Sequence, residues 1–260
     1  MASNAWLKGD LLHGRRVFVP RPGAQAQGLI KAIQTAGGEA IRCPVLRIEP
    51  TAITARAKQQ IIHLDQYDVL IFISRNAVQL GLDRIADDWP RLPSHLRCFA
   101  VGKRTAACLE DEGVGAIVPS AGFNSEALLQ LPALQQLTDQ RVLIFKGDGG
   151  RELLAQCLLE RGAQVESLIL YRREVIHYCA DELQTLFTSG LPEALIATSV
   201  EVLTAMNELL QPELDDCFEL PLVVASERIA QAAKELGYQQ IISAHSAADE
   251  SIVAALNSIG

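Results

Sequence analysis

The feature that most constrains the fold is an internal repeat that covers most of the chain. The segment RVFVPRPGAQAQGLIKAIQTAGGEAIRC, which begins at Arg16, is matched by RVLIFKGDGGRELLAQCLLERGAQVESL, which begins at Arg141. The apolar run that ends at Ser74, VLIFIS, is matched by the run that ends at Ser199, ALIATS. Both pairs are 125 residues apart (141 minus 16, and 199 minus 74), so one structural pattern occurs twice in nearly constant register.

The repeated segments have the pattern of alternating strands and helices. Apolar runs rich in Val and Ile lead into segments of helical period, and Gly37 and Gly162 stop two of these helices at equivalent positions. In a third pair of segments Gly113 stands opposite Gly237, 124 residues later, so one residue has been gained or lost. The sequence therefore predicts an α/β fold of two similar domains, each a mostly parallel sheet flanked by helices.

Composition and charge exclude several classes of partner. The 260 residues are 49% hydrophobic and 21% charged, which suffices for one large domain or two modest ones. The net charge of -8 repels polyanions, so we expect neither nucleic acid nor a membrane surface as a partner. The N-terminal segment lacks the apolar core of a signal peptide, and no run approaches the roughly 18 apolar residues of a membrane span. We therefore expect a cytoplasmic protein.

The cysteines and histidines do not form the patterns typical of metal or redox sites. No CxxC pair occurs, and no histidine has the spacing of a metal ligand. We expect reduced thiols that serve as small core residues, surface or capping roles for the histidines, and no metal. The residues are Cys43, Cys98, Cys108, Cys157, Cys179 and Cys217, and His13, His63, His95, His177 and His245.

The glycine-rich turn in RVLIFKGDGGRELL has the strand, turn and helix order of a phosphate-binding loop. A P-loop needs a second glycine five residues after Gly147, but Glu152 stands there. The dinucleotide fingerprint needs a small residue at the same place and fails for the same reason. The alternative is that Gly147, Gly149 and Gly150 only permit a tight turn. A nucleotide site is therefore disfavoured.

Basic residues follow the predicted strands at five of the six strand-to-helix turns, and the sixth, TSVEV, offers only hydroxyls. Ligands of open α/β sheets bind at this edge, where helix N-termini present free N–H groups to anions. We therefore expect a cleft between the two domains that binds a ligand with several negative groups. The residues at these turns are Arg21, Ser74, Arg75, Lys103, Arg104, Thr105, Lys146, Arg151, Ser226 and Arg228.

Seven motifs in this order resemble the uroporphyrinogen-III synthase family of bacterial type: VPRPG, FISRNAV, AVGKRTA, FNSEALL, FKGDGGRELL, YRRE and VVASERIA. The similarity runs from about Arg16 to the C-terminus. The resemblance implies a monomeric, cofactor-free enzyme that closes the linear tetrapyrrole hydroxymethylbilane into uroporphyrinogen III, with inversion of the last pyrrole ring and loss of water. It also explains an anion-binding cleft, because the substrate carries eight carboxylates.

The resemblance implies domain boundaries as well. In the family the chain starts in one domain, crosses to the second and returns, so that domain 1 is expected to combine residues 1–42 with residues 173–260. Domain 2 is expected to be continuous over residues 47–167. Residues 43–46 and 168–172 are then the two strands of a hinge, and relative motion of the domains is expected across it.

The family pattern points to catalytic roles for Tyr171 in YRRE and Thr105 in GKRTA. A phenol stays protonated at neutral pH and can donate a proton to the hydroxyl that leaves. The alternatives are that Tyr171 packs the hinge and that Thr105 is an ordinary first-turn helix residue. One departure is Ile229, where some relatives carry a threonine. The expected substrate-binding residues are Arg21, Ser74, Arg75, Lys103, Lys146, Gly147, Arg151, Ser199, Ser226 and Arg228.

Two rival functions share parts of this pattern. A two-domain protein that binds a small polyanionic metabolite would have the same cleft and hinge, but would give Tyr171 no role. A nucleotide-dependent enzyme would bind phosphate at Gly147, so that ATP or NAD would raise the melting temperature; we expect no such shift.

Overall fold

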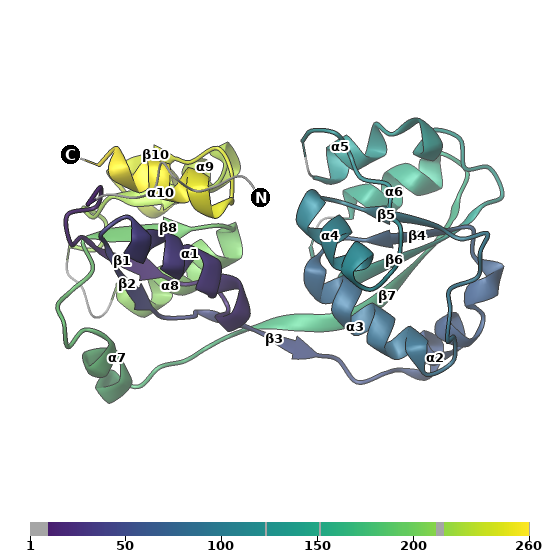
Figure 1. Cartoon of the computed structure of the whole chain (residues 1–260), viewed down its shortest axis with the longest axis horizontal. Coiled ribbons are helices and arrows are strands. Elements are labelled where there is room, and N and C mark those ends of the chain that lie inside the picture. The colour runs from purple at the N-terminus through teal and green to yellow at the C-terminus, as the bar shows by residue number, and fades with distance from the viewer. Residues whose placement is uncertain (1–9, 123, 151, 212–215, 260) are drawn as a thin grey trace. The chain divides into compact units, whose positions relative to one another are not determined.

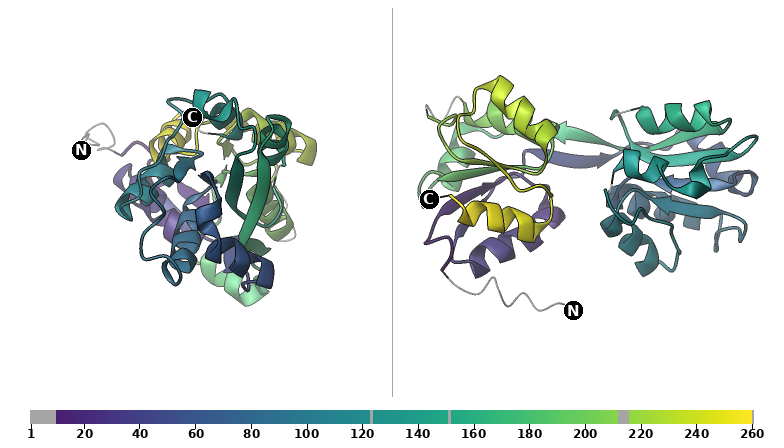
Figure 2. Two further views of the ribbon diagram at one scale, coloured as in Figure 1. Left: turned by 90° about the vertical axis from the view of Figure 1, so that its right-hand side faces the viewer. Right: turned by 90° about the horizontal axis from the view of Figure 1, so that it is seen from above.

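The structure is a computed structural model that describes residues 10–122, 124–150, 152–211 and 216–259. The chain divides into two compact units. Unit 1 combines Met1–Arg47 with Glu174–Gly260, and unit 2 is Ile48–Arg173. Each unit contains a five-stranded, mostly parallel sheet with helices on both faces, which confirms the predicted α/β fold class (Figures 1 and 2).

The sheet of unit 1 is parallel and has the strand order β10-β9-β8-β1-β2. Its strands are β1 (Arg16–Val19), β2 (Glu39–Arg42), β8 (Ala194–Ala197), β9 (Leu222–Val224) and β10 (Ile241–Ser243). Val17 of β1 pairs with Ala40 on one side and Ala194 on the other, so β1 is an inner strand. Inner strands covered on both faces are apolar throughout, which explains the run of Val and Phe in β1.

Four of the unit 1 helices cover the two faces of this sheet. Leu29 of α1 and Ile252 of α10 pack with Val17 on one face, and Leu203 of α8 and Ile229 of α9 share the core of the other. The helices of the unit are α1 (Gly23–Thr35), α7 (Ala180–Leu186), α8 (Val200–Leu210), α9 (Glu227–Leu236) and α10 (Asp249–Asn257).

The sheet of unit 2 has the order β3-β7-β6-β4-β5. Its strands are β3 (Leu46–Pro50), β4 (Val69–Phe72), β5 (Arg97–Ala100), β6 (Arg141–Gly147) and β7 (Gln164–Val175). Strands β4, β5, β6 and β7 run parallel, and one further bridge joins Phe99 to Ile117 beyond β5.

The two faces of the unit 2 sheet carry different helices. Residues of α2 (Ala55–Ile62), α3 (Arg75–Ala86) and α4 (Lys103–Asp111) share one core with Phe72 and Phe145. Residues of α5 (Ser125–Leu129) and α6 (Leu153–Glu160) share the other core with Ile71 and Ile144. Two 3-10 turns, η2 (Leu64–Gln66) and η3 (Pro132–Leu134), complete the unit.

The predicted repeat is present in both sheets. The order β9-β8-β1-β2 of unit 1 corresponds, strand by strand, to β5-β4-β6-β7 of unit 2. Gly37 and Gly162 follow equivalent helices with φ of 80° and 87°, the left-handed conformation that a helix stop requires. Each unit, however, combines parts of both copies of the repeat. Unit 1 takes β1, α1 and β2 from the first copy and its remaining strands from the second. Unit 2 takes β6, α6 and β7 from the second copy and its remaining strands from the first.

A β-bulge interrupts the pairing of β6 with β7. Lys146 is opposite Ile169, but Gly147 is opposite Tyr171, so Leu170 is the extra residue. Side chains of a regular strand alternate between faces, yet Leu170 and Tyr171 both lie in the core beneath α3 and α4. The bulge therefore turns Tyr171 toward the α3 face of the sheet.

Strands β3 and β7 also carry the chain between the two units. The Thr51 N–H donates to the Leu170 carbonyl and the Ile176 N–H donates to the Val45 carbonyl, both at 2.9 Å. One residue number falls as its partner's rises, so the two segments run antiparallel. In unit 1 the Tyr178 hydroxyl donates to the Pro44 carbonyl at 2.8 Å and fixes these segments to each other.

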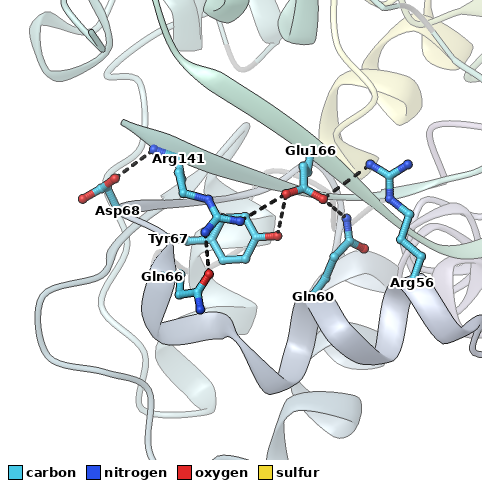
Figure 3. A network of polar contacts seen from close by, with 7 residues as sticks. All are labelled: Arg56, Gln60, Gln66, Tyr67, Asp68, Arg141 and Glu166. Carbon is cyan, nitrogen blue, oxygen red and sulfur yellow. Dashed lines mark hydrogen bonds and ion pairs between the residues drawn. The ribbon is translucent and has the colours of Figure 1, made fainter. Parts of the chain in front are cut away.

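A polar network at the amino edge of the unit 2 sheet holds α2 against β7 (Figure 3). The Glu166 carboxylate accepts hydrogen bonds from Gln60 Nε2 at 2.8 Å and from the Tyr67 hydroxyl at 3.1 Å. Arg56 and Arg141 each lie 3.4 Å from it. Burial alone raises the pKa of Glu166, but these hydrogen bonds outweigh it and the net pKa is lowered. Burial, reinforced by the Glu166 charge, raises the pKa of Tyr67 to about 12.

Candidate active site

Tyr171 and Ser74 form a hydrogen-bonded pair at the carboxyl edge of the unit 2 sheet. Their hydroxyl oxygens are 2.9 Å apart, and the Tyr171 side chain is buried. Ser74 also caps α3, because its Oγ accepts the Ala77 N–H at 3.1 Å. The pairing arises because β4 ends at Phe72 and the bulge turns Tyr171 toward the start of α3.

Gly147 lies directly against the Tyr171 ring. A Cβ atom added at Gly147 would lie 2.5 Å from Tyr171 Cε2, so only glycine allows this approach. The Asp148 N–H donates to the Tyr171 carbonyl at 2.6 Å, and the Arg173 guanidinium carbon is 5.9 Å from the ring centroid. The Tyr171 backbone is therefore fixed by Asp148, and its ring is contacted by Gly147 and by the Arg173 guanidinium.

The first turn of α4 places the remaining predicted residues of this edge. Thr105 is buried, and its N–H donates to the Gly102 carbonyl at 3.0 Å. Lys103 and Arg104 are exposed. Within the ranges that the structure describes, no hydrogen bond joins Thr105 or Arg75 to the pair formed by Ser74 and Tyr171.

Lys146 lies on the opposite face of the sheet from Tyr171. Consecutive strand residues point to opposite faces, so Gly147 faces the α3 side and Lys146 faces the α6 side. Only 10% of the Lys146 side chain is exposed, and its Nζ lies 2.9 Å from Glu152 Oε1. The predicted residue Arg151 lies outside the residues that the structure describes.

The carboxyl edge of unit 1 carries the second set of predicted residues. Ser199 caps α8 by accepting the Val202 N–H at 3.1 Å, as Ser74 does for α3. Ser226 stands at the N-cap of α9, and Arg228 is exposed in the first turn of that helix. Ile229, the departure from the family pattern, is buried in the core.

Arg21 in unit 1 is bound within the fold. The side chain is buried, its Nη1 donates to Asp249 Oδ1 at 2.5 Å and its Nη2 donates to the Ala247 carbonyl at 2.6 Å. These bonds attach the turn after β1 to the start of α10. The partner Asp249 was not anticipated, because 228 residues separate the two in sequence.

Three of the six cysteines lie in the core, as expected for small core residues. All six cysteines are free; Cys43, Cys98 and Cys217 are buried, whereas Cys179 is exposed. Burial raises the pKa of the Cys43 thiol to about 11, so it stays protonated. In the described part of the chain no three His, Cys, Asp or Glu side chains converge as metal ligands, and no helix is long and apolar enough to cross a membrane.

The sequence and the fold of this chain are similar to those of known proteins. A family model described as Uroporphyrinogen-III synthase HemD matches residues 27–254. The chain belongs to the uroporphyrinogen-III synthase family. A uroporphyrinogen-III synthase of Escherichia coli (strain K12) is 32% identical over 246 residues, which is 92% of this chain and 99% of that protein. One of Salmonella typhimurium (strain LT2) is 33% identical over 247 residues, with the same coverage.

Solved structures of the synthase family share the fold. A mutant uroporphyrinogen III synthase of the extremely thermophilic bacterium Thermus thermophilus aligns with a TM-score of 0.60 at 16% identity, over 92% of this chain and 96% of that one. The synthetase of Helicobacter pylori 26695 aligns with a TM-score of 0.59 at the same identity and coverage. At this identity the likeness concerns the fold alone, and it matches the two mostly parallel sheets described above.

Proposed function

We propose that the protein closes hydroxymethylbilane into uroporphyrinogen III, with inversion of the last pyrrole ring and loss of water. The observation that carries this proposal is family membership over nearly the whole chain, since 99% of the Escherichia coli synthase is covered. The buried pair of Tyr171 and Ser74 at the carboxyl edge supplies a hydroxyl donor where ligands of parallel sheets bind.

The first chemical step is departure of the terminal hydroxyl. The carbon–oxygen bond breaks, the oxygen takes a proton and leaves as water, and an electrophilic azafulvenium cation remains. The final ring closure releases one proton, which returns to the donor. We assign this donor to Tyr171. Ser74 can donate its own hydroxyl proton to the Tyr171 oxygen while it accepts the Ala77 N–H, which leaves the phenolic proton directed to the substrate.

The later steps depend on position more than on acid and base. The substituted carbon of the last ring attacks the azafulvenium cation, and the resulting spiro compound fragments and closes again with that ring inverted. Direct closure would give the type I isomer, so the enzyme must hold a flexible chain in the less accessible geometry. A site with few titratable groups suits this task.

The eight carboxylates of the substrate need several anion sites. We propose that the helix N-termini at the two carboxyl edges bind them, together with the basic residues beside these turns. Each hydrogen bond to a carboxylate contributes roughly 1.5 to 3 kcal/mol. Because Arg21 already binds Asp249, the remaining predicted residues carry this binding. They are Ser74, Arg75, Lys103, Lys146, Gly147, Arg151, Ser199, Ser226 and Arg228, with Thr105 beside the reacting hydroxyl.

The activity test supplies freshly generated hydroxymethylbilane and separates the porphyrin isomers after oxidation. The type III isomer should exceed the type I isomer that forms spontaneously. Type I product alone would remove the synthase proposal and leave a protein that only binds a polyanion. ATP and NAD, added at the same ionic strength, should leave the melting temperature unchanged.

Tyr171→Phe tests the proposed proton donor. Removal of one hydroxyl keeps the packing of the ring, and loss of a general acid typically costs about 100-fold or more in kcat. The matched control is Tyr67→Phe, because Tyr67 also loses a bonded hydroxyl in unit 2 but lies at the amino edge. Equal kcat values for the two variants, measured with circular dichroism as a check of folding, would return Tyr171 to a packing role.

We further infer a monomer that acts in the cytoplasm. The family resemblance supports this, and a monomer needs no second copy to complete the carboxyl edges described above. Sedimentation equilibrium should give a single species near the chain mass of 28.2 kDa.

A further inference from the structure

We propose that the pocket beside Lys146 binds one carboxylate side chain of the ligand, and that Glu152 occupies the lysine until this carboxylate replaces it. The assignment of the carboxylate to a tetrapyrrole rests on the proposed function. The pocket itself rests on the geometry of unit 2 alone.

The pocket has a volume of about 160 Å³ and lies on the α5 and α6 side of the sheet. Its walls include the apolar side chains of Ile73, Val101 and Ile144, and its polar lining includes Lys146, Ser125 and Ser167. A buried ammonium with hydroxyls nearby is suited to a carboxylate, while the apolar walls accommodate the methylene groups of an acetate or propionate chain.

The two side chains of the ion pair between Lys146 and Glu152 differ in burial. The lysine side chain is nine-tenths buried, but 70% of the Glu152 side chain is exposed. Glu152 stands at the N-cap of α6, and its side chain makes no capping hydrogen bond. An incoming carboxylate can displace Glu152 from Lys146, because the exposed Glu152 carboxylate is solvated by water once it leaves the lysine.

The equivalent turn of unit 1 provides the contrast. Arg21 is bound by Asp249, of which only 20% is exposed, and by the Ala247 carbonyl. There the fold supplies a buried and fixed partner, as expected for a structural ion pair. At Lys146 the same position of the repeat has an exposed and removable partner, which indicates a site for an incoming anion.

Two glycines of the turn beside Lys146 line the pocket. Gly149 and Gly150 adopt φ of 69° and 85°, and both are exposed. Among the described residues, a Cβ atom added at either glycine would meet nothing within 4 Å. The glycines therefore serve the turn conformation and place no side chain of their own over the pocket.

The pocket lies across the sheet from Tyr171, so it holds a part of the ligand that does not react. Loss of the lysine should therefore weaken binding more than it slows chemistry. Lys146→Met should raise KM for hydroxymethylbilane roughly tenfold, as expected for one lost charge-assisted hydrogen bond, and change kcat less than KM. Glu152→Gln should lower KM, because it removes the competing carboxylate and keeps the lysine.

These opposite signs separate a binding site from a structural ion pair. A structural pair predicts that both substitutions raise KM or that neither changes it, and either result would overturn the proposal. Glu160→Gln, an exposed acid at the other end of α6, is the matched control and should leave KM unchanged. If Lys146→Met fails to fold, Lys146→Gln replaces it, and the fall in KM of Glu152→Gln remains decisive.

A binding measurement removes the dependence on turnover. Uroporphyrin III, which keeps the eight carboxylates, should raise the melting temperature more in Glu152→Gln than in the unmodified protein, and less in Lys146→Met. Inorganic phosphate at equal ionic strength should give no shift that depends on Lys146; such a shift would replace the carboxylate with a phosphate group. Type I product from the unmodified protein would contradict the proposed function, whereas type III product with unchanged KM in Lys146→Met contradicts only the pocket.

Discussion

At the scale of single residues, Gly147 is a position where the fold leaves no room for a side chain. Its missing side chain lets the Tyr171 ring lie against the β6 backbone, and the ring in turn reaches Ser74. Gly147 has no positive φ, so the demand for glycine comes from the close approach of the ring and not from backbone strain.

Gly147→Ala should destabilise the protein by about 1–3 kcal/mol, the usual cost of an added methyl group in a packed core. It should also displace the Tyr171 hydroxyl and lower kcat. Urea denaturation of the protein measures the loss of stability, and the isomer assay measures the fall in kcat.

Two further variants test whether contact with the Tyr171 ring causes this loss of stability. Gly115→Ala is the matched control, because a Cβ atom there meets nothing within 4 Å, and it should change stability by less than about 0.5 kcal/mol. In a Tyr171→Leu background the cost of Gly147→Ala should fall, since the ring that it meets is gone. An equal cost in both backgrounds would show that the ring is not the constraint.

Some residue roles could be predicted from sequence and others could not. Ser74 and Ser199 follow apolar strands at equivalent positions of the repeat, and both cap helices in the structure. The contact of Gly147 with Tyr171 and the pairing of Arg21 with Asp249 carry no local signal, because they join residues far apart in the chain. In the sequence, Glu152 stands out only as a residue that breaks a phosphate-loop pattern.

At the scale of elements, the network around Glu166 is the main polar attachment of α2. Glu166→Gln should lower the free energy of unfolding at pH 7 by about 1 kcal/mol, because the carboxylate that accepts these hydrogen bonds is lost. Urea denaturation at several pH values measures the difference between the two proteins.

The pH dependence of this difference follows from the lowered pKa of Glu166. A carboxylate whose folded pKa lies below its unfolded value of 4.5 stabilises the fold above that value and loses the contribution as the pH falls through the folded value. The difference in the free energy of unfolding between the two proteins should therefore shrink as the pH falls below 4.5. Glu110→Gln, at an exposed position on α4, should show no such convergence. A constant difference from pH 7 to pH 3 would contradict the assignment.

The strands and helices of the repeat could be predicted from apolar runs, helical period and glycine stops. The bulge in β7 could not, because Leu168, Leu170 and Tyr171 occur in an apolar stretch that an ordinary strand would also allow. Its effect on Tyr171 is set by pairing with β6, which is 24 residues away in sequence at this point. Sequence reasoning therefore found the tyrosine but not the face that it occupies.

At the scale of the whole molecule, each unit has two apolar cores of its own. Leu203→Ala in α8 and Leu109→Ala in α4 remove fully buried side chains of units 1 and 2. Each should cost about 2–5 kcal/mol in its own unit. Amide hydrogen exchange read by mass spectrometry should show faster exchange in the strands of the altered unit and little change in the other.

The Leu203→Ala and Leu109→Ala variants serve as controls for each other, because each leaves the other unit unaltered. If either substitution accelerates exchange equally in β1 and β6, the two units unfold as one cooperative body. A single unfolding transition that both variants shift by the same amount would support the same conclusion.

The division of each repeat copy between the two units also sets an order of folding during synthesis. Strand β1 lies between β2 and β8, and β8 begins 175 positions after β1 ends (194 minus 19). At roughly 5–20 residues per second, the ribosome needs about 10 to 35 seconds to supply that neighbour. Unit 2 is complete shortly before then, since its last strand ends at Val175, 19 positions before β8 begins (194 minus 175). The apolar N-terminal strand therefore waits, with one edge unpaired, while the middle of the protein folds, and this interval is when a nascent chain most needs a chaperone.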